Sequence, residues 1–171
     1  METSWKPVSR IGLFLGIIAS IVFWFHALTD NDGFLMLDYI NLPFHEFGHL
    51  FFGIFGRTIG IWGGTIAQLL MPSMVLLSFW TRRETSGVAF SIFWIGENLL
   101  NISVYIADAR SRLLPLVGGG EHDWFIILSG MNILQYDTMI AGIVKALGWI
   151  IMIGAIAWLA IRVRGNSTEH D

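Results

Sequence analysis

The chain has no cysteine and few charged residues, and each shortage excludes a class of protein. Without cysteine, the 171 residues form no disulfide, iron–sulfur cluster, thiolate zinc site or cysteine nucleophile. Any metal ion must therefore be bound by His, Asp or Glu, and any hydrolysis must use water or a hydroxyl group. Charged residues make up only 13% of the chain, against about 25% in a soluble domain. A net charge of −3, with no basic cluster longer than two residues, gives no indication of nucleic-acid binding.

Apolar residues fill the place of the missing charges. They make up 54% of the chain and include eight Trp and thirteen Phe, and the mean hydropathy is +0.64. A soluble chain of this length could hardly bury so many large aromatic side chains. We therefore predict an all-α integral membrane protein with about four transmembrane helices, plus a short membrane-embedded or re-entrant helix. Residues 1–171 are expected to form a single membrane domain.

The charged residues divide the chain into segments. A hydrocarbon core of about 30 Å requires roughly 20 apolar residues of helix. The expected spans are residues 11–28, 61–80, 87–107 and 138–161. The remaining segments are a head (1–10), loops (29–43 and 108–123), a short dipping helix (44–56), an apolar stretch too short to span (124–134) and a disordered tail (162–171).

Three pairs of basic residues flank these spans and indicate their orientation. They are Lys6 with Arg10, Arg82 with Arg83, and Arg162 with Arg164. Lys and Arg are enriched in cytoplasmic loops. We therefore expect both termini to be cytoplasmic, in a bacterial inner (cell) membrane. The loop 108–123 and the mouth of the dipping helix then lie on the outer side.

The segment most informative about chemistry reads His45-Glu46-Phe47-Gly48-His49, an HExxH motif. On a helix, residues four apart share one face, so both imidazoles can bind one zinc ion. Glu46 lies one residue along, where it can act as general acid/base on a metal-activated water. These ionisable side chains lie within an apolar stretch, where such residues are costly and usually functional.

The segment PFHEFGHLFF around this motif resembles the HE(L/F)GH segment of the intramembrane zinc metalloproteases of the site-2-protease type. In that family the motif lies within a membrane helix, and a Gly-rich stretch follows it, as residues 53–64 do here. The resemblance implies Zn²⁺ as cofactor, His45 and His49 as zinc ligands, and Glu46 as catalytic acid/base. The resemblance does not extend to the third ligand. In that family an Asn-Pro-Asp-Gly or Leu-Asp-Gly segment supplies it, and this sequence contains neither segment.

The third metal ligand must therefore be sought among the residues that remain. His122 is the best candidate by residue type, because few other histidines compete for the role. Asp123, Asp108 and Glu97 are the alternatives.

Four polar residues form a narrow stripe along the expected span 87–107 and its end, namely Glu97, Asn101, Tyr105 and Asp108. They can make hydrogen bonds between helices, or they can support the metal ligands or position substrate. A buried carboxyl group such as that of Glu97 needs a partner.

These observations predict a membrane-embedded zinc-dependent hydrolase, metallopeptidase-like, that uses Glu46 and a metal-activated water. The alternatives are a zinc-dependent lipid or small-amide hydrolase and a non-enzymatic metal-binding membrane protein. The expected partners are membrane lipid and a peptide or lipid-derived substrate, with no nucleic acid.

Overall fold

The computed structural model describes residues 5–8, 10–29, 37–116 and 121–167. These residues form an all-α fold, as predicted, with one isolated bridge between Lys6 and Glu84 and no strand. The elements are α1 (Arg10–Thr29), α2 (Asp38–Gly53), α3 (Arg57–Thr81), α4 (Thr85–Ala107), α5 (Asp123–Gly130), the 3₁₀ turn η1 (Leu134–Tyr136) and α6 (Asp137–Ser167).

Within the described part of the chain, three helical segments are long and apolar enough to cross a membrane. They are Arg57–Thr81, Thr85–Ala107 and Leu134–Arg164. The described part of α1 supplies a shorter apolar helix, Gly16–His26, and α2 has only 16 residues. At 1.5 Å per residue, α2 is about 24 Å long, which is less than the thickness of a hydrocarbon core. The prediction of membrane-spanning helices is thus confirmed for three helices.

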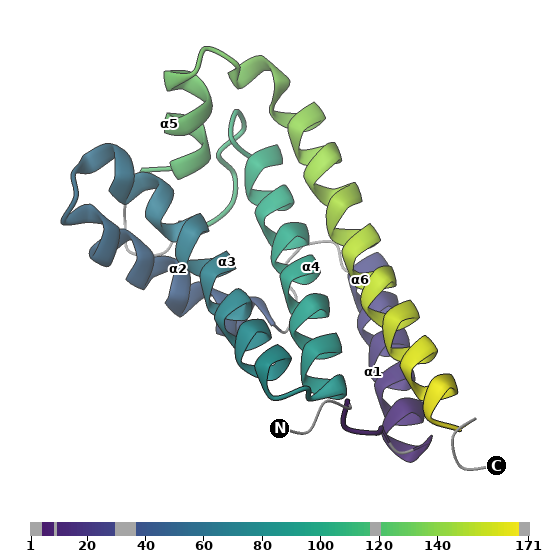
Figure 1. Ribbon diagram of the computed structural model, residues 1–171. Helices are drawn as coiled ribbons and strands as arrows, with labels where there is room; N and C mark the ends of the chain where they lie inside the picture. Colours follow the sequence, from purple (N-terminus) through teal and green to yellow (C-terminus); the bar gives the residue numbers. More distant parts are fainter. Residues whose placement is uncertain (1–4, 9, 30–36, 117–120, 168–171) are drawn as a thin grey trace.

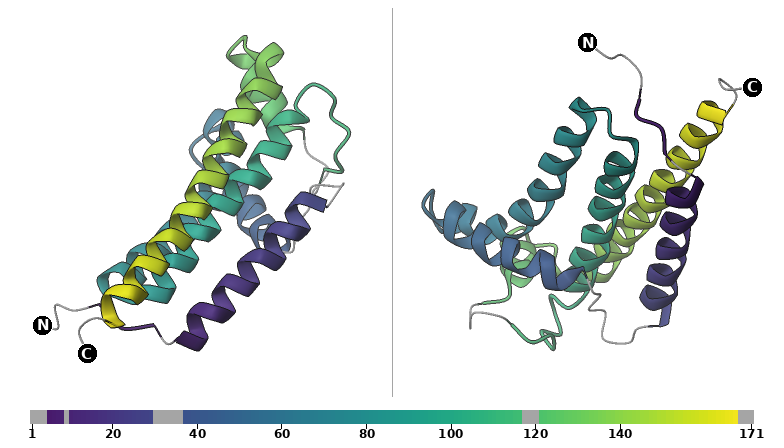
Figure 2. Two further views of the ribbon diagram at one scale, coloured as in Figure 1. Left: turned by 90° about the vertical axis from the view of Figure 1, so that its right-hand side faces the viewer. Right: turned by 90° about the horizontal axis from the view of Figure 1, so that it is seen from below.

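The three long helices lie side by side, with α4 packed between α3 and α6 (Figure 1). Glycines permit the close approach of α4 and α6, because a Cβ on Gly96 would lie 2.8 Å from the carbonyl oxygen of Gly148. α1 lies beside α6, and α2 packs obliquely on α3 (Figure 2). Both termini and the α3–α4 turn lie at one end of the bundle, whereas α5 lies at the other (Figure 1). Lys6, Arg83 and Arg162 therefore share one end, as the pattern of basic residues predicted.

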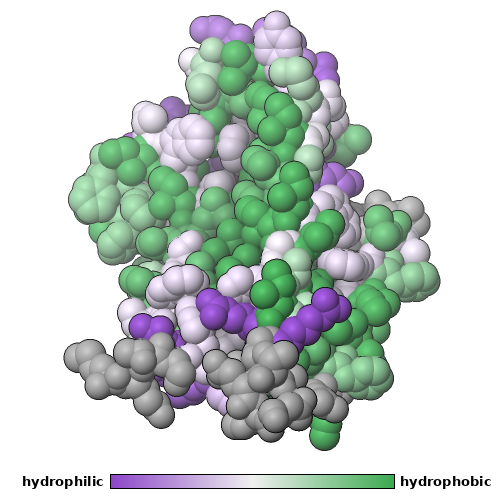
Figure 3. Space-filling model, turned by 45° about the vertical axis from the view of Figure 1, so that its right-hand side comes forward, coloured by the Kyte–Doolittle hydropathy of each residue, from purple (hydrophilic) through white to green (hydrophobic). Residues whose placement is uncertain are grey.

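The surface of the bundle is apolar along its length. Figure 3 shows a broad hydrophobic area over the helices, with hydrophilic residues gathered toward the two ends. Exposed apolar side chains on α6 include Ile143, Ile150 and Ile153, each more than half exposed. An exposed apolar surface of this extent is unusual on a soluble monomer and is what a bilayer requires.

Helices α2 and α6 depart most from the segments that the sequence pattern indicated. α2 begins at Asp38, so the predicted loop 29–43 is wrong for its last six residues, which include Pro43. Burial of Asp38 and Asn41 against α4 extends this helix upstream of the proline. α6 continues to Ser167, beyond the predicted helix end at residue 161 and into the predicted disordered tail. Residues 168–171 of that tail lie outside the described part of the chain.

Candidate metal centre

The HExxH motif lies on α2, with both histidines on the side that packs against α3. Gly48 and Gly63 bring the two backbones together, because a Cβ on Gly48 would lie 2.1 Å from the carbonyl oxygen of Gly63. His45 and His49 are one helical turn apart, and their ring centroids are separated by 4.7 Å. His45 is buried and His49 is half-buried. The spacing of the motif therefore places both imidazoles beside each other, as predicted.

Asp123, the first residue of α5, completes a group of three possible metal ligands. Its Oδ2 atom lies 3.1 Å from Nε2 of His45 and 3.1 Å from Nε2 of His49. The three potential ligand atoms all lie within 4.8 Å of one another. The backbone N–H of Asp123 donates to the hydroxyl oxygen of Tyr105 on α4, at 3.3 Å. α2, α4 and α5 thus meet at one cluster that could hold a metal ion.

The other ring nitrogens of both histidines face oxygen acceptors. Nδ1 of His49 lies 2.8 Å from the carbonyl oxygen of Gly60, and Nδ1 of His45 lies 3.1 Å from Oε1 of Gln68. The Gln68 side chain is oriented in turn, because its Nε2 donates to Oδ1 of Asn101 at 2.8 Å. A proton on each Nδ1 satisfies these contacts and leaves the lone pair on each Nε2. Contacts of this kind fix the tautomer and orientation of metal-binding histidines.

The cluster needs positive charge between its three ligand atoms. Two Nε2 lone pairs and a carboxylate oxygen within contact distance repel one another unless protons or a cation lie among them. The pKa of His49 is accordingly raised, chiefly by its hydrogen bond to Asp123 and also by the Gly60 carbonyl. Burial alone would raise the pKa of Asp123, but hydrogen bonds from His45 and His49 outweigh it and lower that pKa. A metal cation can supply this positive charge, because it binds neutral imidazole and ionised carboxylate.

Glu46 supplies a further carboxylate on the same helix as both histidines. It is half-buried on α2, and its charge contributes to the raised pKa of His49. It interacts electrostatically with Tyr105 as well. Glu46 therefore interacts electrostatically with His49 and Tyr105 and is not one of the three potential ligands.

Gly64 on α3 leaves the space directly in front of both imidazoles open. A Cβ at this position would lie 2.6 Å from Nε2 of His45 and 2.6 Å from Nε2 of His49. Real Cβ atoms do not approach other atoms so closely, so only glycine fits here without displacing the rings. The absence of a side chain thus preserves the volume that an ion shared by the two Nε2 atoms needs.

Gly64→Ala should therefore weaken the binding of a divalent metal ion, by roughly 10- to 100-fold, as when the groups that orient metal ligands are disturbed. Competition with a chromophoric chelator measures this affinity. The matched control is Gly154→Ala on α6, where an added Cβ meets nothing within 4 Å. Equal affinity in both variants would show that the ion does not occupy the space beside Gly64.

His122, the ligand that the sequence favoured, does not lie in this group. It precedes α5, where its Nδ1 accepts a hydrogen bond from the backbone N–H of Phe125 at 3.2 Å. Its Nε2 faces Oδ2 of Asp108 at 3.4 Å. Burial lowers the pKa of His122, although the Asp108 carboxylate acts in the opposite direction. The structure therefore brings the alternative ligand Asp123, and not His122, to His45 and His49.

Asp108 is occupied by the loop that follows α4. Its carboxylate accepts hydrogen bonds from the Ser111 hydroxyl at 2.6 Å and from the backbone N–H groups of Leu113 and Leu114 at 2.9 and 3.0 Å. Burial would raise the pKa of Asp108, but these hydrogen bonds, with His122, lower it. Asp108 thus shapes the loop that leads toward α5 and lies outside the cluster of three ligands.

The rest of the polar stripe on α4 is divided between two sites. Asn101 contacts the cluster through Gln68, and Tyr105 contacts it through the backbone of Asp123. Glu97 is fully buried and accepts a hydrogen bond at 2.9 Å from Asn41, one turn before His45 on α2. Asn41 is held in turn by Trp94, whose indole N–H donates to it at 2.8 Å. The predicted interhelical hydrogen bonds are therefore present, and Glu97 is not among the three potential ligands.

Sequence reasoning did not single out Gln68 or Asn41 and assigned no role to the Gly60 carbonyl. Gln68 and Asn41 carry a recognisable signal, because a polar side chain within or beside an apolar run needs a buried partner. The Gly60 carbonyl carries none, because any residue has one. Gly60 and Gly64 are both buried beside α2.

Comparison with known proteins does not add to this description. No protein-family model matches the chain, and neither a curated protein nor a solved structure matches it.

Proposed function

We propose that this chain is a membrane-embedded zinc-dependent hydrolase of the metallopeptidase type. The observation that carries the proposal is the convergence of Nε2 of His45, Nε2 of His49 and Oδ2 of Asp123, with the charge of Glu46 acting on His49. Two imidazoles and one carboxylate are a donor set that suits zinc, and three protein ligands leave a position open for catalysis. The resemblance of the HEFGH segment to site-2-type metalloproteases supports the same assignment.

The residues of the chain have separable roles in the proposed reaction. Zinc, when bound, supplies Lewis-acid activation of a water molecule. Glu46 accepts the proton of the attacking water and passes it to the leaving amine. Gln68 and the Gly60 carbonyl fix the orientation of the two imidazole rings. Tyr105 holds the start of α5, and with it Asp123, by accepting the backbone N–H.

The surroundings of the centre favour a substrate that approaches through the membrane. On α2, Phe47 and Leu50 are each more than half exposed, as is Ile54 at the C-cap of this helix. Lipid tails or an apolar peptide segment can contact these side chains without the loss of any polar contact. The HExxH motif favours a peptide as the substrate. The exposure of these apolar side chains is the observation that makes a lipid-derived substrate the second candidate.

Removal and restoration of the metal test the proposal. Membranes that contain the protein are treated with a zinc chelator and then resupplied with Zn²⁺, and released peptides and lipid products are identified by mass spectrometry. We expect peptide fragments to disappear with chelation and to return with zinc. Metal-dependent lipid products without peptide fragments would favour the second candidate. If no product responds to chelation, the proposed hydrolase activity is wrong.

We propose in addition that α1 is a fourth span and that both termini lie in the cytoplasm of a bacterial cell. α1 has 20 residues, about 30 Å of helix, and the basic residues Lys6, Arg83 and Arg162 share the end of the bundle at which it begins. Proteolysis of terminal tags in sealed inverted vesicles tests this topology. Tags that are protected in such vesicles would contradict it.

A further inference from the structure

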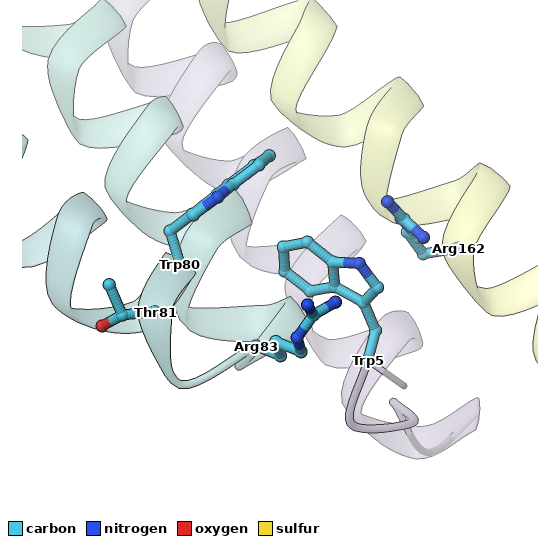
Figure 4. A pocket seen from close by; sticks show the side chains of 5 residues that line it. All are labelled: Trp5, Trp80, Thr81, Arg83 and Arg162. Atoms are coloured by element: carbon cyan, nitrogen blue, oxygen red, sulfur yellow. The ribbon is translucent and has the colours of Figure 1, made fainter. Parts of the chain in front are cut away.

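A pocket opens at the end of the bundle that carries both termini, away from α5. Its volume is about 370 Å³, and it is lined by Trp5, Trp80, Thr81, Arg83 and Arg162. Figure 4 shows the Trp5 ring between the side chains of Arg83 and Arg162, with Trp80 facing it from α3. Sites for small ligands have volumes of roughly 300–1,000 Å³. The pocket is therefore large enough for a headgroup-sized ligand.

The N-terminal segment forms one wall of this pocket, because it is fastened to the α3–α4 turn. The backbone N–H of Lys6 donates to the carbonyl oxygen of Arg83 at 3.0 Å, and the Thr85 hydroxyl donates to the carbonyl oxygen of Lys6 at 2.6 Å. The Lys6 ammonium also pairs with the Glu84 carboxylate. Arg83 itself has φ +54°, a left-handed conformation that is uncommon for a residue with a Cβ. Several contacts thus hold this turn in an unfavourable conformation.

Aromatic rings, and not a carboxylate, hold Arg162 in place. The edges of the Trp5 ring meet Trp80 and Trp158, with centroids 5.0 and 5.4 Å apart. The Arg162 guanidinium carbon lies 4.7 Å from the centroid of Trp5 and 5.3 Å from that of Trp158. Among the described residues no carboxylate pairs with Arg162. A guanidinium stacked in this way keeps its N–H groups, which lie in its plane, for an anion.

Among the described residues, the side chains that line the pocket include two cations, Arg83 and Arg162, and no carboxylate. Glu84 is the acidic residue of the α3–α4 turn, and it is already paired with Lys6. Arg82 and Arg164 lie nearby in the chain and add further positive charge without lining the pocket. An anion is therefore the favoured ligand.

The position of the pocket indicates which kind of anion it binds. It lies where two membrane-spanning segments, Arg57–Thr81 and Leu134–Arg164, both end. Trp and Arg at the ends of spans lie at the level of lipid headgroups, and basic pockets between membrane helices bind anionic headgroups. We propose that this pocket binds the phosphodiester headgroup of an anionic phospholipid, with Arg83 and Arg162 as its cationic contacts.

The test compares lipid binding by the full chain with that of two double variants. Arg83→Gln with Arg162→Gln removes both pocket charges. Arg82→Gln with Arg164→Gln removes two charges from the same end but outside the pocket, so the loss of net charge is matched. Each protein is reconstituted with phosphatidylglycerol or phosphatidylcholine, and bound lipid is counted by native mass spectrometry.

We expect the wild type and the control to prefer phosphatidylglycerol, and the pocket variant to lose roughly 30-fold of that preference, since each charge near a membrane surface contributes about a factor of five. An equal loss in both double variants would overturn the proposal in favour of diffuse surface attraction. If the wild type binds inorganic phosphate in the absence of lipid as well as it binds phosphatidylglycerol, the pocket is a site for free phosphate, and the proposal is overturned. If the pocket variant does not fold, Arg83→Gln against Arg82→Gln gives the same comparison, with a loss of about fivefold expected for the former alone.

Discussion

Replacing Glu46 with glutamine is expected to lower turnover by about 10²- to 10⁴-fold while zinc stays bound. This range is what a positioned general acid/base contributes to a reaction. Glu46 is not one of the three potential metal ligands, so its loss removes proton transfer and not the ion. Glutamine has nearly the same size and hydrogen-bonding reach, so α2 should keep its packing on α3.

The experiment measures turnover and bound zinc on the same preparation. Glu121→Gln is the matched control, because Glu121 is exposed and paired with Arg57 in a surface contact. The control should keep both turnover and zinc. Wild-type turnover in Glu46→Gln would show that this carboxylate takes no part in the reaction, and loss of zinc would show that it is a ligand after all.

The second large effect distinguishes Asp123 from its neighbour His122. Asp123→Asn is expected to lower zinc affinity by about 100- to 1,000-fold, because it removes the only anionic ligand of the cluster while it keeps the shape and the backbone contact to Tyr105. His122→Asn should change the affinity by less than about tenfold. Asparagine also caps helices well, so it can replace the contact that His122 makes at the start of α5.

Zinc competition with a chromophoric chelator gives both affinities. The ratio of the zinc affinities of the two variants decides between the two residues, because they are adjacent and both lie at the start of α5. If His122→Asn loses as much affinity as Asp123→Asn, the ligand set contains the residue that the sequence favoured, and α5 must rotate when the ion binds.

The reason the sequence could not choose between these two residues is geometric. The His122–Asp123 pair itself was visible as a source of the third ligand. Which of the two side chains turns inward depends on where α5 begins, and that is decided by contacts distant in sequence. Tyr105 binds the backbone of Asp123, and Asp108 faces His122. Residue type favoured histidine, whereas these contacts turn the aspartate toward the cluster.

The helices were predictable for a different reason. Charges are rare in this chain, so the segments between them indicate α3 and α4 to within four residues at each end, and α6 except for its last six residues. The start of α2 was missed because Pro43 and the acidic residues before it resemble a loop. Asp38 and Asn41 are nevertheless buried, and Asn41 contacts Glu97, 56 residues away. A contact between residues so far apart in the sequence leaves no local pattern from which it can be predicted.

The most direct test of the proposed centre is the metal content of the wild-type chain, purified from its membrane without added metal. Elemental analysis should find about one zinc ion per chain, and the double variant His45→Ala, His49→Ala should contain none. A wild-type protein that carries no zinc and takes up none when Zn²⁺ is supplied would contradict the account.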